Sequence, residues 1–174
     1  MCAAELQSLV SFAASKNCFD GVLSDDVCNA RNLEVLSLDG FNSGLLCSER
    51  HRDFVATPTP AIPTCLWELP SLGMLHLSSI LYAGVLEFGH NRSSAHRVGP
   101  QAALKNLSLS HNRAVGTIPV SVFNHMWFEL DLSFNRFDGH LGVNISLQGG
   151  GSARLGVNRL SGVRSCYCSM SFWA

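Results

Sequence analysis

Histidine and cysteine are the residue types best able to hold a metal ion or to supply a nucleophile, and this chain contains seven of each. The histidines are His51, His76, His90, His96, His111, His125 and His140. None belongs to the His-Glu-x-x-His pattern that places two zinc ligands on one helix face. Cys166 and Cys168 have no second ligand pair at zinc spacing. We therefore expect no metal site and no cofactor.

Other residues with chemical potential also lack the partners that a reaction needs. The glycine-rich stretch 148–156 follows no strand that leads into a phosphate-binding lysine, so we interpret it as the degenerate start of a repeat. Asp25 and Asp26 are adjacent and indicate a solvated turn. Serine, histidine and aspartate all occur, but no spacing indicates a catalytic triad. The sequence predicts a protein that is not an enzyme.

One ordered pattern of residues recurs along the chain. In "LKNLSLSHNRAVGTIP" (104–119), leucines occupy places one, four and six, asparagine place nine and glycine place thirteen. Two copies keep this order, "WFELDLSFNRFDGHL" (127–141) and "GSARLGVNRLSGV" (151–163), and two vary it, "LGMLHLSSILYAGVL" (72–86) and "LEVLSLDGFNSGLL" (33–46). Place one of the three best repeats falls at positions 104, 127 and 150, which are 23 residues apart. Leucine-rich repeats have a period of roughly 20–29 residues.

The pattern has a physical explanation as one coil of a solenoid. Leu107 and Leu109 alternate with Ser108, so the leucines of a short strand point inward and the serine points outward. Such leucines are buried only when strands of successive coils stack in parallel. Asn112 follows the strand, and its amide can satisfy backbone groups of the turn. Gly116 permits an unusual backbone conformation, and Pro119 suits a segment outside a central sheet.

The predicted fold class is α/β, a leucine-rich repeat solenoid. We expect a short parallel sheet on its concave face and irregular or 3₁₀ segments on its convex side. About five repeats form the solenoid at 30–165, with irregular insertions at 48–61 and 95–101. Residues 1–29 are expected to form a degenerate cap-like segment and 166–174 a C-terminal tail.

Composition narrows the classes of partner. Hydrophobic residues make up 47% and charged residues 14% of the 174 residues, and the formal net charge is -1. This balance supplies a core and provides no basic field for nucleic acid or an anionic membrane. No run of 18 apolar residues is present, and residues 1–18 do not resemble a secretory signal peptide. The seven cysteines leave two alternatives open, disulfides formed in an oxidising compartment or free buried thiols.

The repeats carry a resemblance to a known class of proteins. The form "LS-N-G-IP" resembles the plant-specific leucine-rich repeats of receptor-like kinases, receptor-like proteins and polygalacturonase inhibitors. The linker around Glu87, Phe88, His90 and Asn91, followed by "IPVSVF", resembles the ectodomain of plant receptor-like proteins of the disease-resistance type. Compared with that family the chain is truncated or degenerate.

The resemblance implies recognition of a peptide or protein ligand at the plasma membrane, on its extracellular side, in defence signalling through a partner receptor kinase. Two alternatives remain open: a secreted protein similar to polygalacturonase inhibitors, and a truncated or pseudogene product without independent function.

The expected binding surface is the concave sheet of the solenoid. Its candidate ligand-binding residues are His76, Ser108, His111, Glu129, Asp131, Phe134 and Arg154. The asparagines expected to form a structural ladder are Asn112, Asn135 and Asn158. Three Asn-x-Ser sites make Asn91, Asn106 and Asn144 candidates for glycosylation. A glycan on Asn106 would project from the concave face and obstruct a ligand.

Overall fold

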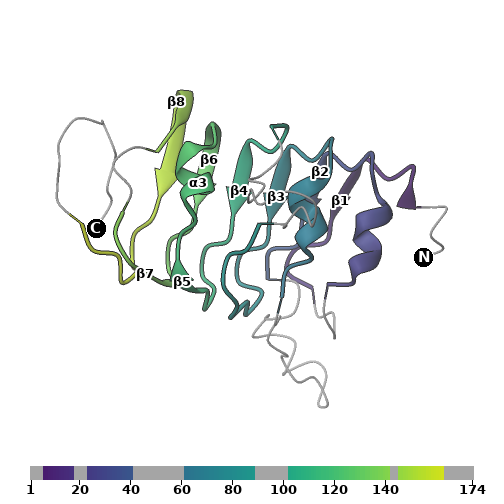
Figure 1. Ribbon diagram of the computed structural model, residues 1–174. Helices are drawn as coiled ribbons and strands as arrows, with labels where there is room; N and C mark the ends of the chain where they lie inside the picture. The colour runs from purple at the N-terminus through teal and green to yellow at the C-terminus, as the bar shows by residue number, and fades with distance from the viewer. Residues whose placement is uncertain (1–5, 18–22, 41–60, 89–101, 142–144, 163–174) are drawn as a thin grey trace, which may run out of the picture.

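The structure is a solenoid of short coils stacked along one axis. The computed structural model describes residues 6–17, 23–40, 61–88, 102–141 and 145–162. Each coil contributes one strand to a parallel sheet of six strands in chain order, β1-β2-β3-β4-β6-β8. Figure 1 shows these strands side by side, from purple at the N-terminal end to yellow at the C-terminal end. The expected parallel sheet and repeat stacking are confirmed.

The strands of this sheet are short because only a few residues of each coil alternate between core and surface. They are β1 (Ser11–Ala13), β2 (Val35–Ser37), β3 (Met74–His76), β4 (Asn106–Ser108), β6 (Trp127–Asp131) and β8 (Leu147–Arg154). Leu36, Leu75, Leu107, Leu130 and Ala153 are successive partners in register. The fourth place of each predicted repeat therefore occupies the same position in the sheet.

The leucines of successive coils form one continuous core. Leu36, Leu75, Leu107 and Leu130 are each at most 1% exposed. Trp67 and Trp127 are buried between the sheet and the opposite side of the coils. Burying one leucine side chain contributes about 1.5–3 kcal/mol, and a single coil cannot achieve this burial alone.

The first strand, β1, lies in the segment for which the sequence analysis expected only a cap-like structure. Phe12 pairs with Leu36, and Leu9, Phe12 and Ala14 pack against the core from places one, four and six of a coil. Asn17 occupies place nine, where its side-chain nitrogen donates to the carbonyls of Ala14 and Ser15 at 3.1 and 3.2 Å. Residues 6–17 thus have the geometry of a further coil. The domain boundary at 29/30 stays a prediction.

The side of the coils away from the six-stranded sheet carries short helices. These are the 3₁₀ helices η1 (Asp25–Asn29) and η2 (Thr64–Glu68) and the α-helix α3 (Val120–Asn124). Pro63 and Pro119 directly precede η2 and α3 at their N-caps. Proline fits there because its fixed φ suits the approach to a helix and its missing N–H is not needed. The 3₁₀ segments agree with the expected architecture, and α3 is an α-helical exception to it.

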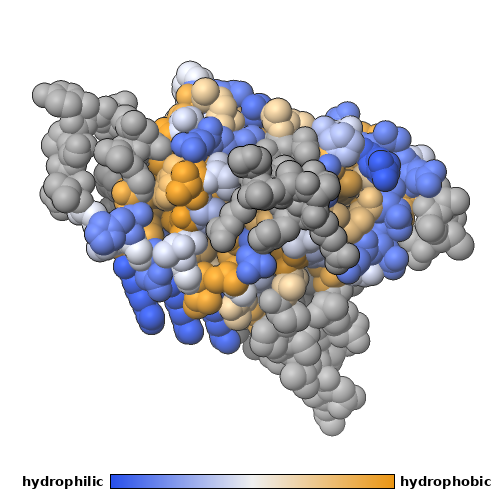
Figure 2. All heavy atoms as spheres, viewed as in Figure 1, coloured by the Kyte–Doolittle hydropathy of each residue, from blue (hydrophilic) through white to orange (hydrophobic). Residues whose placement is uncertain are grey.

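A second, two-stranded sheet lies at one flank of the coils. It pairs β5 (Val115–Thr117) in parallel with β7 (Arg136–Asp138). On this flank Arg113, Arg136 and Arg159 each follow an asparagine of the ladder and are exposed. Hydrophilic side chains project in a row at the lower edge of the coils, near the place of β5 and β7 (Figure 2).

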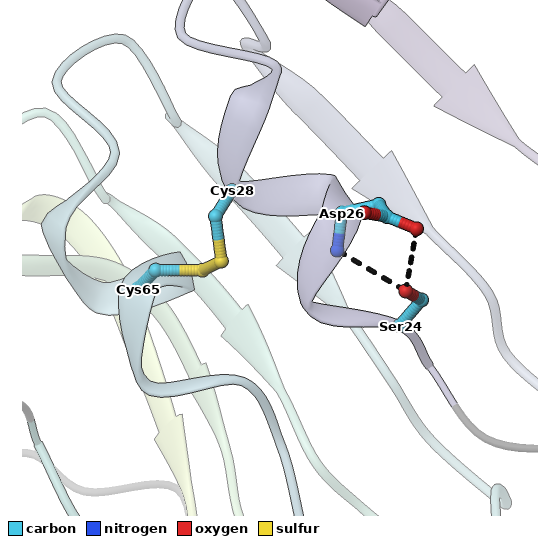
Figure 3. The surroundings of a disulfide bond; sticks show 4 residues. All are labelled: Ser24, Asp26, Cys28 and Cys65. Carbon is cyan, nitrogen blue, oxygen red and sulfur yellow. Dashed lines mark hydrogen bonds between the residues drawn. A yellow bond between two sulfur atoms is a disulfide. The ribbon is translucent and has the colours of Figure 1, made fainter. Parts of the chain in front are cut away.

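A disulfide between Cys28 and Cys65 joins the two 3₁₀ helices (Figure 3). Their Cα atoms lie 5.6 Å apart, although the residues are 37 positions apart in sequence. Ser24 caps η1 by accepting a hydrogen bond from the backbone N–H of Asp26 at 3.1 Å. Asp25 and Asp26, expected in a solvated turn, lie in the first turn of η1, where negative charge is favourable.

Several expectations concern residues outside the described ranges. These are most of the insertion at 48–61, the insertion at 95–101, the tail at 166–174, and the linker residues His90 and Asn91. They stay predictions.

Candidate ligand-binding surface

The exposed face of the six-stranded sheet is composed of rows that cross the strands. We call this surface the sheet face. Its fifth-place row contains Ser37, His76, Ser108, Asp131 and Arg154, and its third-place row contains Val35, Met74, Asn106, Glu129 and Ser152. Adjacent parallel strands lie about 4.8 Å apart, so each row is a line of closely spaced side chains. The candidate residues of β3, β4, β6 and β8 therefore share one surface.

A cluster of charges occupies the C-terminal end of the sheet face. Arg154 donates to a carboxylate oxygen of Glu129 at 2.7 Å and lies 3.9 Å from a carboxylate oxygen of Asp131. Asp131 also accepts hydrogen bonds from the backbone N–H and hydroxyl of Ser133, at 3.0 and 2.6 Å. A solvent-exposed ion pair contributes only about 0–1 kcal/mol to stability. The cluster therefore fixes side-chain orientation more than it stabilises the fold.

His76 lies near the middle of the fifth-place row. Its Nδ1 is 3.8 Å from a carboxylate oxygen of Asp39. Its other ring nitrogen, Nε2, has no hydrogen-bond partner among the described residues. Nearby, the hydroxyls of Ser78 and Ser108 are 2.7 Å apart. This part of the surface offers the small hydroxyl groups of Ser78 and Ser108, whereas Nε2 of His76 is buried.

An exposed aromatic pair borders the sheet face where the strands end. The rings of His111 and Phe134 are stacked, with centroids 4.2 Å apart and planes inclined by 17°. Phe134 remains 46% exposed, and Val157 in the next coil is 65% exposed. All three residues occupy place eight and have positive φ, between 54° and 56°. The turn thus holds apolar side chains toward solvent beside the charged cluster.

The asparagines of place nine organise the turns behind this border. Asn135 donates from Nδ2 to the carbonyls of Leu109 and Leu132 at 2.9 and 3.2 Å, and its Oδ1 accepts from Ala114 N–H at 3.0 Å. Asn158 makes the corresponding bonds with Leu132, Leu155 and Phe137.

The remaining member of the ladder, Asn112, bonds to a coil that has no asparagine of its own at place nine. Asn112 donates to Leu77 and Leu109 and accepts from Ile80 and Tyr82, at 2.9–3.1 Å. Three of these bonds correspond to those of Asn135 and Asn158, and the bond from the N–H of Ile80, which stands at place nine of its own coil, is additional.

Of the glycosylation candidates, Asn106 lies on the sheet face as the first residue of β4 and is partly buried. Asn91 and Asn144 lie outside the described residues. The expectation that the three asparagines carry glycans stays a prediction.

The glycine-rich stretch at the C-terminal end is part of the sheet. Glycines 149–151 lie within β8, whose pairing with β6 is irregular between Trp127 and Glu129. A Cβ on Gly151 would lie 2.9 Å from the carbonyl oxygen of Phe128, which only glycine avoids. The glycines therefore restore the register that aligns Arg154 with Asp131, as their interpretation as a repeat start predicts.

Elsewhere in the described residues, two titratable side chains, one buried and one partly buried, hydrogen-bond to backbone carbonyls. Burial and the negative charge of Glu87 raise the pKa of Tyr82 to about 12, and its hydroxyl donates to the carbonyl of Val85. Burial lowers the pKa of His125, whose Nε2 contacts the carbonyl of Leu104. Across the described ranges, no three His, Cys, Asp or Glu side chains gather as a metal site requires. Within the same ranges, no helix is long and apolar enough to cross a membrane.

The sequence analysis missed several residues of the sheet face. Val35, Met74 and Ser152 lie in the third-place row but were not candidates, because the leucine pattern does not distinguish exposed places that vary. Asp39 beside His76 was missed for the same reason. The sequence does contain a sign of β1, because Leu9 and Asn17 have the spacing of places one and nine of a repeat. Phenylalanine and alanine replace the leucines of places four and six, which hides the pattern.

No protein-family model and no curated protein matches the chain. Solved structures do. One is the leucine-rich repeat ectodomain of the plant membrane receptor kinase GASSHO1/SCHENGEN3 from Arabidopsis thaliana, in complex with CASPARIAN STRIP INTEGRITY FACTOR 2. It has 26% identity and a TM-score of 0.65, and the match covers 90% of this chain and 16% of that one.

Two further structures share the fold. A TDR receptor matches with 17% identity and a TM-score of 0.64, over 91% of this chain and 24% of that one. A plant ice-binding protein matches with 19% identity and a TM-score of 0.54, over 87% of this chain and 50% of that one. The chain thus spans a half or less of each matched structure. It adopts a leucine-rich repeat fold similar to that of plant receptor ectodomains.

Proposed function

We propose that the sheet face binds a peptide or protein ligand, and that the chain acts by recognition within the extracellular part of a plant cell-surface receptor-like protein. The observation that carries the proposal is the alignment of charged and polar side chains in rows across five strands, with an exposed pair of aromatic rings at their border. Aromatic anchors beside oriented polar groups are typical of binding surfaces.

The likeness to known structures supports recognition over catalysis. The Arabidopsis ectodomain was solved with CASPARIAN STRIP INTEGRITY FACTOR 2 bound, and the present chain is 26% identical to it over the matched part. One matched structure is the ectodomain of a receptor kinase and another is a receptor. The present chain is therefore best regarded as a binding surface that requires no chemistry of its own.

Within this proposal the candidate residues have different roles. Phe134 and His111 anchor an apolar group of the ligand. Glu129, Asp131 and Arg154 orient its charges, and His76 and Ser108 provide hydrogen-bonding groups between them. Defence signalling, a partner receptor kinase and an extracellular position at the plasma membrane follow from the family resemblance and are part of the same proposal.

The proposal is tested by selecting a displayed random-peptide library on the immobilised full chain. Selected peptides are then measured for binding to two variants of the sheet face, Phe134→Ala and Asp131→Asn. Because Phe134 is exposed, its truncation leaves the core intact. We expect at least one of the two variants to weaken binding by about tenfold or more, as removal of a central anchor does.

The matched control is Arg159→Ala, an exposed residue on the flank that carries β5 and β7. Its binding should equal that of the unmodified chain. Peptides whose affinity is unchanged by both sheet-face variants and weakened by Arg159→Ala would indicate that recognition occurs on the flank. Failure to select any peptide would count against peptide recognition.

A further inference from the structure

A hollow of about 310 Å³ lies at the edge of the sheet face, among the residues at place two of successive repeats. It is lined by Glu34, Val35, Gly73, Met74, Lys105 and Asn106. Gly73 creates the depression, because a Cβ placed there would have no atom nearer than 3.7 Å. The hollow therefore has an acidic wall, a partly apolar floor and a basic wall.

Backbone hydrogen bonds show that the coils of Glu34 and Lys105 are separated by one intervening coil, that of Gly73. Gly73 N–H donates to the carbonyl of Glu34 at 2.8 Å, and Lys105 N–H donates to the carbonyl of Gly73 at 3.0 Å. Each such step crosses one inter-strand spacing of about 4.8 Å, so the backbones of Glu34 and Lys105 lie about 9.6 Å apart.

Glu34 and Lys105 make no ion pair within the described residues. Beyond them in the same row lie Val10, which is 48% exposed, and Phe128, which is 49% exposed. In chain order, the row therefore consists of an apolar residue, an acidic residue, a glycine, a basic residue and a second apolar residue.

The separation of the Glu34 and Lys105 backbones, about 9.6 Å, matches one backbone conformation of a peptide that crosses the strands. In a polyproline II helix, residues three apart point to the same side and are about 9.3 Å apart. In an extended strand, residues three apart point to opposite sides, and residues two apart are separated by only about 6.7 Å. A polyproline II segment matches both the direction and the length.

We propose that the hollow is a subsite for a polyproline II peptide segment that carries a basic and an acidic side chain three residues apart. The basic side chain meets Glu34, the acidic one meets Lys105, and the compact residues between them fill the space above Gly73. This inference rests on the proposed peptide recognition and names the chemistry of one part of the ligand.

The test uses fluorescein-labelled peptides with identical Gly-Ser flanks and measures anisotropy with the full chain expressed without glycans. Two probes carry Arg-Pro-Pro-Glu and Glu-Pro-Pro-Arg, which differ in charge order. A spacing control carries Arg-Pro-Glu, and a charge control carries Arg-Pro-Pro-Arg. We expect one order to bind about tenfold more tightly than both controls, as two exposed ion pairs together allow.

Charge reversal in the protein identifies the subsite. Glu34→Lys and Lys105→Glu should each weaken the preferred probe about tenfold. The double variant keeps the net charge and should prefer the probe with the opposite order. Arg31→Glu, at an exposed residue that does not line the hollow, serves as the control and should change nothing.

Equal binding of all four probes, no binding of any of them, or an unchanged order preference in the double variant would overturn the subsite. These results are separable from failure of the proposed function. One such result is that library peptides bind less tightly to Phe134→Ala but equally well to Glu34→Lys and Lys105→Glu. That result would support peptide recognition and reject this subsite.

Discussion

At the residue scale, each coil turns through one left-handed residue at place eight. Gly40 fills this place in one coil, and Lys16, Ser79, His111, Phe134 and Val157 fill it in the others, with φ between 54° and 64°. A residue with a side chain is strained there by about 1–2 kcal/mol. The chain tolerates this cost in five of the six described coils, and in two adjacent coils the residue, Phe134 or Val157, is also apolar and exposed.

The strain at Val157 predicts a stabilising substitution. Val157→Asn should raise the free energy of unfolding by about 1 kcal/mol, because asparagine adopts positive φ more readily than a β-branched residue. Equilibrium urea denaturation measures the change. Val120→Asn is the control, since Val120 is similarly exposed, at 69% against 65%, but does not have positive φ. A gain at Val120 and none at Val157 would contradict the strain.

The asparagine ladder predicts a large loss from a small change. Asn135→Ala should lower the free energy of unfolding by about 3 kcal/mol, because buried carbonyls of Leu109 and Leu132 and the N–H of Ala114 lose their partner. Asn32→Ala removes an exposed hydrogen bond to the carbonyl of Gln7 and should cost about 1 kcal/mol or less. Urea denaturation in which the two variants lose equal stability would show that the ladder has no special role.

At the scale of elements, the leucine pattern predicts most of the sheet but not its first strand. Leucines at places four and six identify β2, β3, β4 and β6 directly, because their alternation is the signal of a one-sided strand. β1 was missed since Phe12 and Ala14 replace those leucines. The helical form of α3 depends on packing behind the sheet, which no spacing in the sequence reports.

The disulfide was also beyond sequence reasoning. Cys28 and Cys65 come together only because η1 and η2 lie in neighbouring coils. Seven cysteines allow many pairings, and no rule selects one of them from spacing alone. The observed bond crosses two coils and constrains the segment between them.

This bond predicts a specific thermodynamic signature. Cys28→Ser should lower the free energy of unfolding by about 3–4 kcal/mol, the loop-closure value for 37 residues. Cys65→Ser should cost the same, and the double variant no more than either, because each single change already removes the bond. Denaturation of all three variants is the measurement. Small losses that add in the double variant would mean that the bond does not stabilise the fold.

At the scale of the whole molecule, one set of rules produces both the core and the candidate binding surface. The register that aligns Leu107 with Leu130 also aligns Ser108 with Asp131, because successive residues of a strand point to opposite faces. The sequence therefore predicts which residues share the sheet face. It does not predict the hollow at Gly73 or the stacking of His111 on Phe134, which depend on contacts between particular coils.

The central claim is that this sheet face, rather than the flank of β5 and β7 or the helical side, receives a peptide. A crystal structure of the full chain with a library-selected peptide tests it most directly. We expect a peptide that crosses the strands from β2 to β8 and contacts the third- and fifth-place rows and Phe134. A peptide seated on β5 and β7, or against α3, would contradict it.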